Sequence, residues 1–470
     1  MVTSNTNTGE RTGADSGHPD SAHPDQGHPD QGADYALSPV PSASRYHWFS
    51  VCVQRFGQLS CLSQFMLGAA LGFGMTFGNA ILAVILGAVI LEAVGIFTGI
   101  IGQREGLSTS VIARWTGFGR WGSGIIGIVL AISLTGWFGV QTGVSAESLK
   151  AIIPVGPIWL WSLLFGIAVT AIVVFGFNSM AWVSYVTVPG FILLAGYLVI
   201  HTLSKYDVGE LASGPPPGPV LTLGAGATLV AGGFIVGMVT TPDMTRFNRS
   251  AADVVKQTLL GVTLGEFVMC MAGVLLAHAL KSSSVVDIVT SSSGFIGTLI
   301  IISGTLKIND WNLYSSTLGI VNALESSFGV RIDRRIVTIV VGVAGSIAAA
   351  VGILDHFVAF LTVLGVAIPP VAAIMVVDYF IVRTWRAELD RAVGQVPSTE
   401  PTLIVGTLVV WLVAGLVGHY VQWGIPSLNS LVVAGVLYVV FAKVGLLKPL
   451  SVQPTRLTAA QAAAAAGVGA

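Results

Sequence analysis

The fold is decided by the stretch Phe56–Gly72, FGQLSCLSQFMLGAALG, which is apolar enough to enter a lipid bilayer but is interrupted by polar side chains. The bilayer core holds no water to hydrogen-bond a polar group, so polar residues there need a partner or a purpose. The interrupting residues are Gln58, Ser60, Ser63 and Gln64. Such a run predicts a membrane-spanning helix that is broken near its middle.

A second interrupted stretch lies in the other half of the chain. Leu229–Met244, LVAGGFIVGMVTTPDM, sets Gly232 and Gly233 beside Phe234. Polar or glycine-rich breaks at corresponding places in two halves indicate a midplane binding site in membrane proteins built from inverted repeats. The alternative interpretation is that Gly and Ser at these places only permit close helix packing.

The composition places the whole chain in the membrane. The 470 residues are 53% hydrophobic and only 10% charged, with a mean hydropathy of +0.81, whereas soluble domains carry about 25% charged residues. We therefore expect an all-α polytopic membrane protein in contact with lipid. The net charge of −1 indicates no nucleic-acid partner. The three cysteines lie in apolar stretches without metal-binding spacing, so we expect them to be core residues.

A bilayer-spanning helix needs about 20 apolar residues, and we expect twelve such runs. They lie near 49–71, 79–101, 123–149, 157–177, 180–203, 222–241, 254–280, 294–323, 335–353, 356–380, 402–422 and 427–446. The two interrupted runs are the first and the sixth, so each begins a set of five helices. This predicts a first repeat over 49–203, a second over 222–380, two peripheral helices over 402–446 and a tail over 447–470.

Lys and Arg residues predict which side of the membrane each loop faces. One set of loops carries twelve of them: Arg104, Arg114, Arg120, Arg246, Arg249, Lys256, Arg331, Arg334, Arg335, Arg383, Arg386 and Arg391. The opposite set carries three, Lys150, Lys205 and Lys281. Because positive charge collects on the cytoplasmic side, we expect both termini to be cytoplasmic.

The first 48 residues repeat His-Pro-Asp at a period of five, with His18, His23 and His28. A segment so rich in Pro, Gly and Asp cannot bury enough apolar surface to fold, so we expect a disordered cytoplasmic tail. The regular histidines could hold a metal weakly, but low-complexity drift is the simpler interpretation.

Several longer motifs resemble the nucleobase:cation symporter-1 family, and within it the cytosine and purine permeases. The motifs are GLSTSVIARWTGFG (106–119), TGWFGVQTG (135–143), GGFIVGMVTTPDMTRFNRSA (232–251), NDWNLYSSTLGIVNAL (309–324) and FVAFLTVLGVAIPPVAAIMVVDYFIVR (357–383). The resemblance implies a LeuT-type fold of five plus five helices in inverted repeat, with helices 1 and 6 broken. It also implies a monomeric permease of the plasma membrane that imports a nucleobase by alternating access.

The resemblance implies an aromatic sandwich for the base. Trp137 matches the tryptophan that stacks on substrate in this family, and Phe234, beside Gly233, matches the aromatic residue on the opposite face. Gln141 lies four residues after Trp137, hence on the same helical face, and is similar to the glutamine of the hydantoin-transporting branch. Cytosine permeases carry a glutamine three residues before the tryptophan, where this chain has Leu134.

Further amides are candidates for reading the edge of the base. Asn309 and Asn312 fit an Asn-x-x-Asn-x-Tyr pattern that resembles the fungal purine-cytosine permeases. An asparagine both donates and accepts hydrogen bonds, which suits the mixed edge of a nucleobase. Gln64 and Ser63 in the break of helix 1 are weaker candidates, because helix capping explains them almost as well.

Lys307 bears on the coupling ion. Sodium-coupled members of the family carry two hydroxyl residues just before the asparagine, where this chain has Lys307 and Ile308. We therefore expect transport that is independent of sodium, either proton-coupled or facilitative and without any cofactor. The alternative is a sodium symporter. In that case Lys307 lies one turn away from the ion site and extends its ammonium group to the membrane interface.

A proton-coupled carrier needs a titratable group within the membrane. Glu92 and Glu266 are both embedded in apolar sequence, where a charged residue costs about 2.5 to 3.5 kcal/mol, and Asp310 lies beside the substrate candidates. We rank Glu92 slightly ahead. Arg55 could pair with one of these carboxylates, which would make that carboxylate structural.

Three other functions are weighed against nucleobase import. Another small heterocycle, such as a hydantoin, allantoin or hydroxymethylpyrimidine, needs the same sandwich and differs at the edge. A substrate-sensing receptor on the same scaffold is a remote alternative. An enzyme is not expected, because His201, His278, His356 and His419 lie near predicted helix ends and form no HExxH-like motif.

Overall fold

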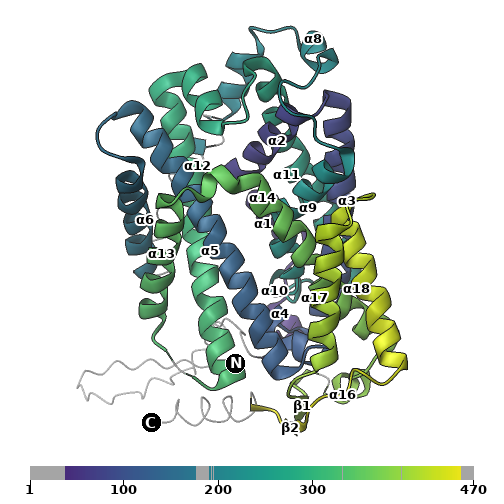
Figure 1. The fold of residues 1–470 in the computed structure, drawn as a ribbon. Coiled ribbons are helices and arrows are strands. Elements are labelled where there is room, and N and C mark those ends of the chain that lie inside the picture. Colours follow the sequence, from purple (N-terminus) through teal and green to yellow (C-terminus); the bar gives the residue numbers. More distant parts are fainter. Residues whose placement is uncertain are drawn as a thin grey trace, which may run out of the picture. The chain divides into compact units, whose positions relative to one another are not determined.

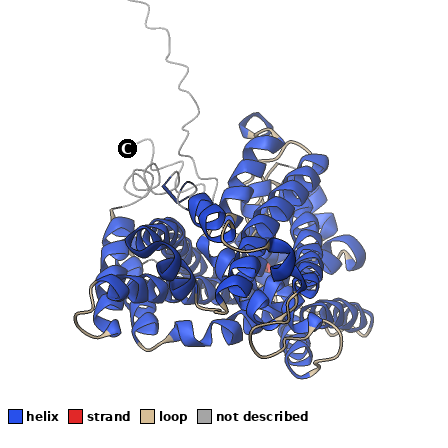
Figure 2. Cartoon of the chain, turned by 90° about the horizontal axis from the view of Figure 1, so that it is seen from above, coloured by secondary structure: helices blue, strands red, loops and turns tan. Residues whose placement is uncertain are grey.

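The computed structural model describes residues 38–175, 190–191, 193, 195–330, 332–392 and 394–456. The His-Pro-Asp repeat, the alanine-rich end and half of the expected fifth span lie outside these residues, although 195–203 are helical. The prediction of an all-α chain is confirmed, and Figure 2 shows that the described part is almost entirely helical.

The first interrupted span is broken as expected. It consists of α1 (Trp48–Leu59) and α2 (Leu62–Gly74), which are bent by 53° across two residues. Cys61 has an extended backbone with φ −137° and ψ 169°, so the helical hydrogen-bond ladder cannot pass through it. The side chains of Cys61 and Ser63 lie 3.0 Å apart at this break.

The remaining long helices coincide with ten further predicted runs. They are α3 (Phe77–Glu105), α5 (Gly119–Ile152), α6 (Ile158–Val174), α9 (Leu223–Val239), α11 (Ala251–Leu280), α12 (Val285–Ala323), α13 (Arg334–Ala350), α14 (Phe357–Ala367) with α15 (Pro369–Val377), α17 (Val405–Tyr420) and α18 (Pro426–Lys443). By length and apolarity alone, five described helical segments can cross a membrane, or six with the bent pair, and three more are apolar but shorter.

The sixth span is not broken at Gly232 and Gly233, contrary to our expectation. Helix α9 runs without interruption through Gly232 and Gly233 and ends at Val239, and α10 (Pro242–Thr245) follows. The glycines serve close packing instead, since a Cβ added at Gly232 would collide with the carbonyl oxygen of Leu361.

Two other spans contain irregular backbone. Helix α12 starts earlier than predicted and is kinked at Gly294, whose φ of 51° only glycine adopts readily. In the tenth span, α14 ends at Ala367 because Pro369 and Pro370 have no N–H to continue its hydrogen-bond ladder.

Two sets of helices surround the centre of the bundle. Helix α5 packs along α12, and α13 packs against both α5 and α6 (Figure 1). Helices α1 and α2 pack on α11, while α9 lies against α3 and α14. The shorter described elements are η1 (Ser42–Ser44), α4 (Thr109–Ile112), η2 (Ala113–Trp115), α8 (Val208–Ser213), η3 (Leu324–Phe328), η4 (Ile353–His356), η5 (Asp378–Val382) and α16 (Arg386–Arg391).

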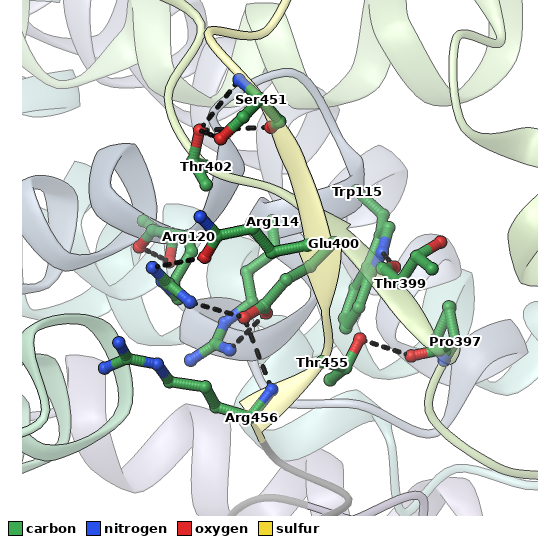
Figure 3. A network of polar contacts seen from close by, with 12 residues as sticks. Arg114, Trp115, Arg120, Pro397, Thr399, Glu400, Thr402, Ser451, Thr455 and Arg456 are labelled. Carbon is green, nitrogen blue, oxygen red and sulfur yellow. Dashed lines mark hydrogen bonds and ion pairs between the residues drawn. The ribbon is translucent and has the colours of Figure 1, made fainter.

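A small β ribbon lies at one end of the bundle. Strand β1 (Thr399–Pro401) pairs antiparallel with β2 (Val452–Pro454), so the last described residues lie beside the linker that precedes α17. Figure 3 shows Glu400 of β1 between two arginines, Arg114 and Arg120. All three side chains are buried, so these two arginines, which we counted among the loop charges, are not exposed to solvent.

Candidate functional site

The break of the first span faces α9 across a narrow gap. Gln64 and Ser63, in the first turn of α2, are both buried. A Cβ added at Gly233 would lie 3.0 Å from Leu67 and 3.7 Å from the amide oxygen of Gln64. Gly233 therefore lets the α2 side chains approach the α9 backbone, and these three predicted residues lie together.

Trp137 lies on α5 and is held by aromatic neighbours from the tenth span. Its ring meets those of Phe357 and Phe360 nearly edge-on, at centroid distances of 6.0 and 5.4 Å and interplanar angles of 72° and 79°. The side chain is 7% exposed. Edge-to-face contacts with two rings hold the plane of the indole.

Phe234 lies on α9, one residue after Gly233. Its ring packs back on Gly237, where an added Cβ would lie 2.7 Å from two ring carbons. The guanidinium carbon of Arg55 lies 5.8 Å from the ring centroid. The sandwich of Trp137 and Phe234 stays a prediction.

Gln141 has a buried amide without a partner. Its side chain is 0% exposed, and neither its oxygen nor its nitrogen forms a hydrogen bond with any described residue. An unsatisfied buried polar group costs about 1–3 kcal/mol, so an orphan amide in a native structure calls for an explanation.

Asn309 contacts the stretch of α5 that contains Gln141, and its amide is already partly engaged. Its amide nitrogen donates to the carbonyl oxygen of Phe138 at 3.2 Å and to the hydroxyl of Thr142 at 2.9 Å. Its amide oxygen is buried without a partner among the described residues. Asn312 is also buried, on the α12 face that packs on α5. Asn309 thus joins two helices and keeps only its acceptor for a ligand.

Sequence reasoning missed the polar seam of which Asn309 is a part. The Thr135 hydroxyl lies 2.8 Å from that of Ser316, and the Ser145 hydroxyl lies 2.6 Å from that of Thr305. The seam residues of α5 are Thr135, Thr142 and Ser145, at helical spacings of seven and three. That spacing, within an otherwise apolar run, was the signal available in the sequence.

Lys307 and Asp310 lie one turn apart on α12. Lys307 is half-buried, and it lies close enough to act electrostatically on Asp310. Both carboxylate oxygens of Asp310 are buried without a hydrogen-bond partner in the described part of the chain. Gly304, one turn earlier, packs on Leu62 at the start of α2. This part of α12 therefore borders the break in the first span.

The two glutamates occupy different surroundings. Glu92 is partly exposed and accepts a hydrogen bond from Thr263 at 2.5 Å. Glu266 is fully buried, with one carboxylate oxygen 3.9 Å from the thiol of Cys270 and the other without a described partner. The same thiol lies 3.4 Å from the backbone oxygen of Gln64. Because Glu266 is buried next to the break of the first span, it is a better candidate for the proton-carrying group than Glu92. This reverses the order in which we ranked the two glutamates from the sequence.

Arg55 pairs with neither glutamate. Its guanidinium donates to the carbonyl oxygen of Gly237 at 3.2 Å and to the hydroxyl of Thr241 at 3.0 Å. As for metals, no group of three His, Cys, Asp or Glu residues able to hold an ion occurs among the residues that the structure describes.

Comparison with known proteins gives a consistent result. The model of a family described as permeases for cytosine/purines, uracil, thiamine and allantoin matches residues 39–440. The cytosine permease of Escherichia coli (strain K12) is 27% identical over 335 residues, which cover 70% of this chain and 77% of that protein.

Two solved structures of Mhp1 share the fold. The inward-facing conformation of Mhp1 has a TM-score of 0.71 and 21% identity, covering 88% of this chain and 97% of Mhp1. The closed conformation of Mhp1, a nucleobase-cation-symport-1 family transporter with bromovinylhydantoin bound, has a TM-score of 0.66 and 22% identity, covering 87% and 95%.

Proposed function

Because this chain belongs to the family of permeases for cytosine/purines, uracil, thiamine and allantoin, we propose that it imports a nucleobase such as cytosine or a purine. It is a secondary transporter of the LeuT-type fold and not an enzyme. Its broken first span and the end of α9 correspond to the place where such folds hold a substrate near the middle of the membrane.

The observation that carries the proposal is the orphan amide of Gln141. Both of its polar atoms are buried without a described partner. A ligand with a donor next to an acceptor restores both hydrogen bonds at once, and so recovers the desolvation cost of the empty site. Cytosine presents such an edge with its ring nitrogen and amino group, and hypoxanthine presents one with its ring N–H and carbonyl.

Aromatic stacking supplies affinity without selecting a particular base. In the proposed site the base lies between Trp137 and Phe234, with Phe357 and Phe360 fixing the indole. Stacking of this kind contributes about 1 to 3 kcal/mol per base. Selection falls to the amides, because a wrong edge leaves Gln141 or the oxygen of Asn309 unpaired.

A second candidate substrate is a small cyclic imide such as a hydantoin. The specific observation is the position of the glutamine. Gln141 lies on the same helical face as Trp137, whereas Leu134 stands where cytosine permeases carry their glutamine. A five-membered ring with alternating N–H and carbonyl groups matches a single carboxamide as well as a nucleobase does. Competition experiments separate the two substrates.

For the driving ion we propose protons, with sodium symport as the alternative. Lys307 brings a positive charge to the part of α12 that borders the broken first span. A fixed ammonium there substitutes for a bound cation between the two helices. Glu266 and Asp310 are buried carboxyl groups with oxygens that lack described partners, so either can carry a proton.

We further propose a plasma-membrane monomer with both termini in the cytoplasm. The Lys and Arg excess on one set of loops supports this orientation even without Arg114 and Arg120, which are buried against Glu400. The end of the bundle that carries the β ribbon is then cytoplasmic (Figure 1).

Uptake of radiolabelled cytosine and hypoxanthine into permease-deficient cells tests the function. We expect saturable accumulation that a proton uncoupler abolishes and that replacement of sodium by choline leaves unchanged. Gln141→Ala should raise the apparent KM about tenfold, equivalent to about 1.4 kcal/mol. The matched control is Gln422→Ala, because Gln422 is exposed and donates to the His419 carbonyl oxygen at 2.6 Å.

Each other outcome has a defined meaning. Strong competition by hydantoin with no uptake of either base identifies the second candidate. Binding of a base without uptake indicates a sensor. An unchanged KM in Gln141→Ala contradicts the site assignment.

A further inference from the structure

Arg55 is a buried cation between α1, in the broken first span, and the end of α9. Its side chain, on α1, is 1% exposed. One guanidinium nitrogen donates to Gly237 in the last turn of α9, and the other donates to Thr241, which follows that helix. Helix α1 packs mainly on α11, so this side chain is a specific link from α1 to α9.

The surroundings of Arg55 offset only part of its charge. None of the ion pairs found among the described residues includes Arg55, and its Nε is buried without a partner there. The carbonyl end of α9 carries a partial negative charge that favours a cation. A buried guanidinium without a carboxylate is nevertheless costly, so stability alone gives a poor reason for an arginine at this place.

Phe234 completes the environment of Arg55. Gly237, which accepts a hydrogen bond from the guanidinium, is also the residue on which the Phe234 ring rests. The guanidinium carbon lies 5.8 Å from the ring centroid, within the range of a cation–π interaction. A cation near an aromatic ring draws π-electron density towards itself, and this makes the ring a better stacking partner for an electron-rich heterocycle.

We propose that Arg55 is a positioning residue for the substrate. It holds the end of α9 and the ring of Phe234 in the stacking geometry, and its charge biases the site towards electron-rich planar heterocycles. The inference rests on the proposed function, because it takes Phe234 as one wall of the base site.

The test measures the apparent KM for cytosine and for 5-fluorocytosine with three variants of the full-length protein. Fluorine withdraws electron density from the ring, so the ratio of the two affinities reports the electronic bias. Arg55→Gln keeps a donor and removes the charge, whereas Arg55→Lys keeps the charge. Arg246→Gln is the matched control, since Arg246 is also buried, donates to the Asp243 carbonyl oxygen and lies 5.0 Å from the Phe247 ring.

We expect Arg55→Gln to raise the apparent KM for cytosine about tenfold, because the ring of Phe234 loses the charged contact that holds it in the stacking geometry. Its preference for cytosine over 5-fluorocytosine should shrink. Arg55→Lys should keep the preference, and Arg246→Gln should change neither quantity. If Arg55→Gln lowers the melting temperature but leaves the KM and the preference unchanged, Arg55 is only structural and the inference fails.

Two more variants keep the test decisive. Phe234→Leu removes the ring: an unchanged KM there overturns the stacking wall of the proposed function, and this inference with it. If Phe234→Leu raises the KM but Arg55→Gln has the KM and the preference of the wild-type protein, the role of Arg55 is overturned and the proposed stacking wall stands. Thr241→Val removes one hydrogen-bond acceptor of Arg55 and leaves the charge in place. This variant replaces Arg55→Gln if that protein does not fold. It must then raise the KM for cytosine while the preference for cytosine over 5-fluorocytosine stays unchanged.

Discussion

Arg114 and Glu400 form an ion pair at 2.7 Å, with both side chains fully buried, although 286 residues separate them in the chain. Arg120 donates to the other carboxylate oxygen at 3.3 Å. The pair joins the segment between α3 and α5 to the linker before α17. Trp115 adds a bond from its indole N–H to the Thr399 carbonyl oxygen at 2.9 Å (Figure 3).

Removal of the charge of Glu400 should strongly destabilise the protein. Burial lowers the pKa of Arg114 from its ordinary value, and the neighbouring Glu400 opposes that shift. Glu400→Gln leaves two buried guanidinium groups without their carboxylate, for which the expected loss is about 3–5 kcal/mol. Thermal unfolding of the purified protein measures it. Asp390→Asn is the control, because the exposed pair of Asp390 with Arg386 is worth about 0–1 kcal/mol.

The strand β2 should be required for the same stability. Within β2, Gln453 accepts from Arg120 at 3.3 Å, and just beyond it the backbone N–H of Arg456 donates to Glu400 at 3.4 Å. Truncation after Leu450 deletes both contacts and exposes Glu400, so the melting temperature should fall by several degrees. Truncation after Arg456 keeps every contact of the network described here and should leave the melting temperature unchanged. Equal effects of the two truncations would contradict this role for β2.

At the opposite end of the bundle, the two ring nitrogens of His278 face two carbonyl groups. One ring nitrogen lies 2.9 Å from the Met75 oxygen, just after α2, and the other lies 3.0 Å from the Leu211 oxygen of α8. The N–H groups of Gly218 and Leu221 bind the two preceding carbonyls of α2. The last carbonyls of the broken span are thus capped by the loop that contains α8 and by His278.

His278→Phe should release this loop. The carbonyl group that faces the ring N–H loses its hydrogen-bond donor, at about 1–3 kcal/mol where it stays buried. Amide hydrogen exchange of residues 208–213 should become faster, while exchange in α12 stays constant. The control is His419→Phe at an exposed histidine. Unchanged exchange in α8 would show that the loop is held by other contacts.

The sequence predicted the break of the first span and misplaced that of the sixth for one physical reason. Ser60, Ser63 and Gln64 are polar residues within an apolar run, so the break there is a local property. At Gly232 the helix continues because the glycine is used by a distant neighbour, Leu361. Glycine permits both a break and a close approach, and only tertiary packing decides between them.

The candidate site was predictable to a similar degree. The burial of Gln141 follows from its place on an apolar helix, but the absence of a described partner depends on side chains from other helices. Glu400 sits in a short polar segment, PSTEP, that reads as a linker, and nothing local links it to Arg114. Pairings between residues this far apart leave no periodic pattern in a single sequence.

Lys307 should be essential for transport that does not need sodium. Loss of its charge in Lys307→Met removes the proposed bridge between α12 and the broken first span, so initial uptake should fall about tenfold or more, equivalent to at least about 1.4 kcal/mol. Lys205→Met, at an exposed lysine, should transport normally. A sodium requirement in the wild-type protein, or full activity of Lys307→Met, would contradict the assignment.

Glu266 should carry the coupling proton, and Glu92 should not. A protonated carboxyl group is far less costly in an apolar environment than a carboxylate. Glu266 is buried, has one oxygen without a described partner, and lies next to the Cys270 thiol, which also contacts the backbone oxygen of Gln64. Glu266→Gln mimics the protonated form permanently. It should therefore still exchange labelled cytosine for unlabelled cytosine across proteoliposome membranes but lose proton-driven accumulation. Glu92→Gln, at the partly exposed glutamate bonded to Thr263, should retain both activities. Loss of accumulation in Glu92→Gln alone would restore the ranking that the sequence suggested, and loss in Asp310→Asn alone would move the proton to α12.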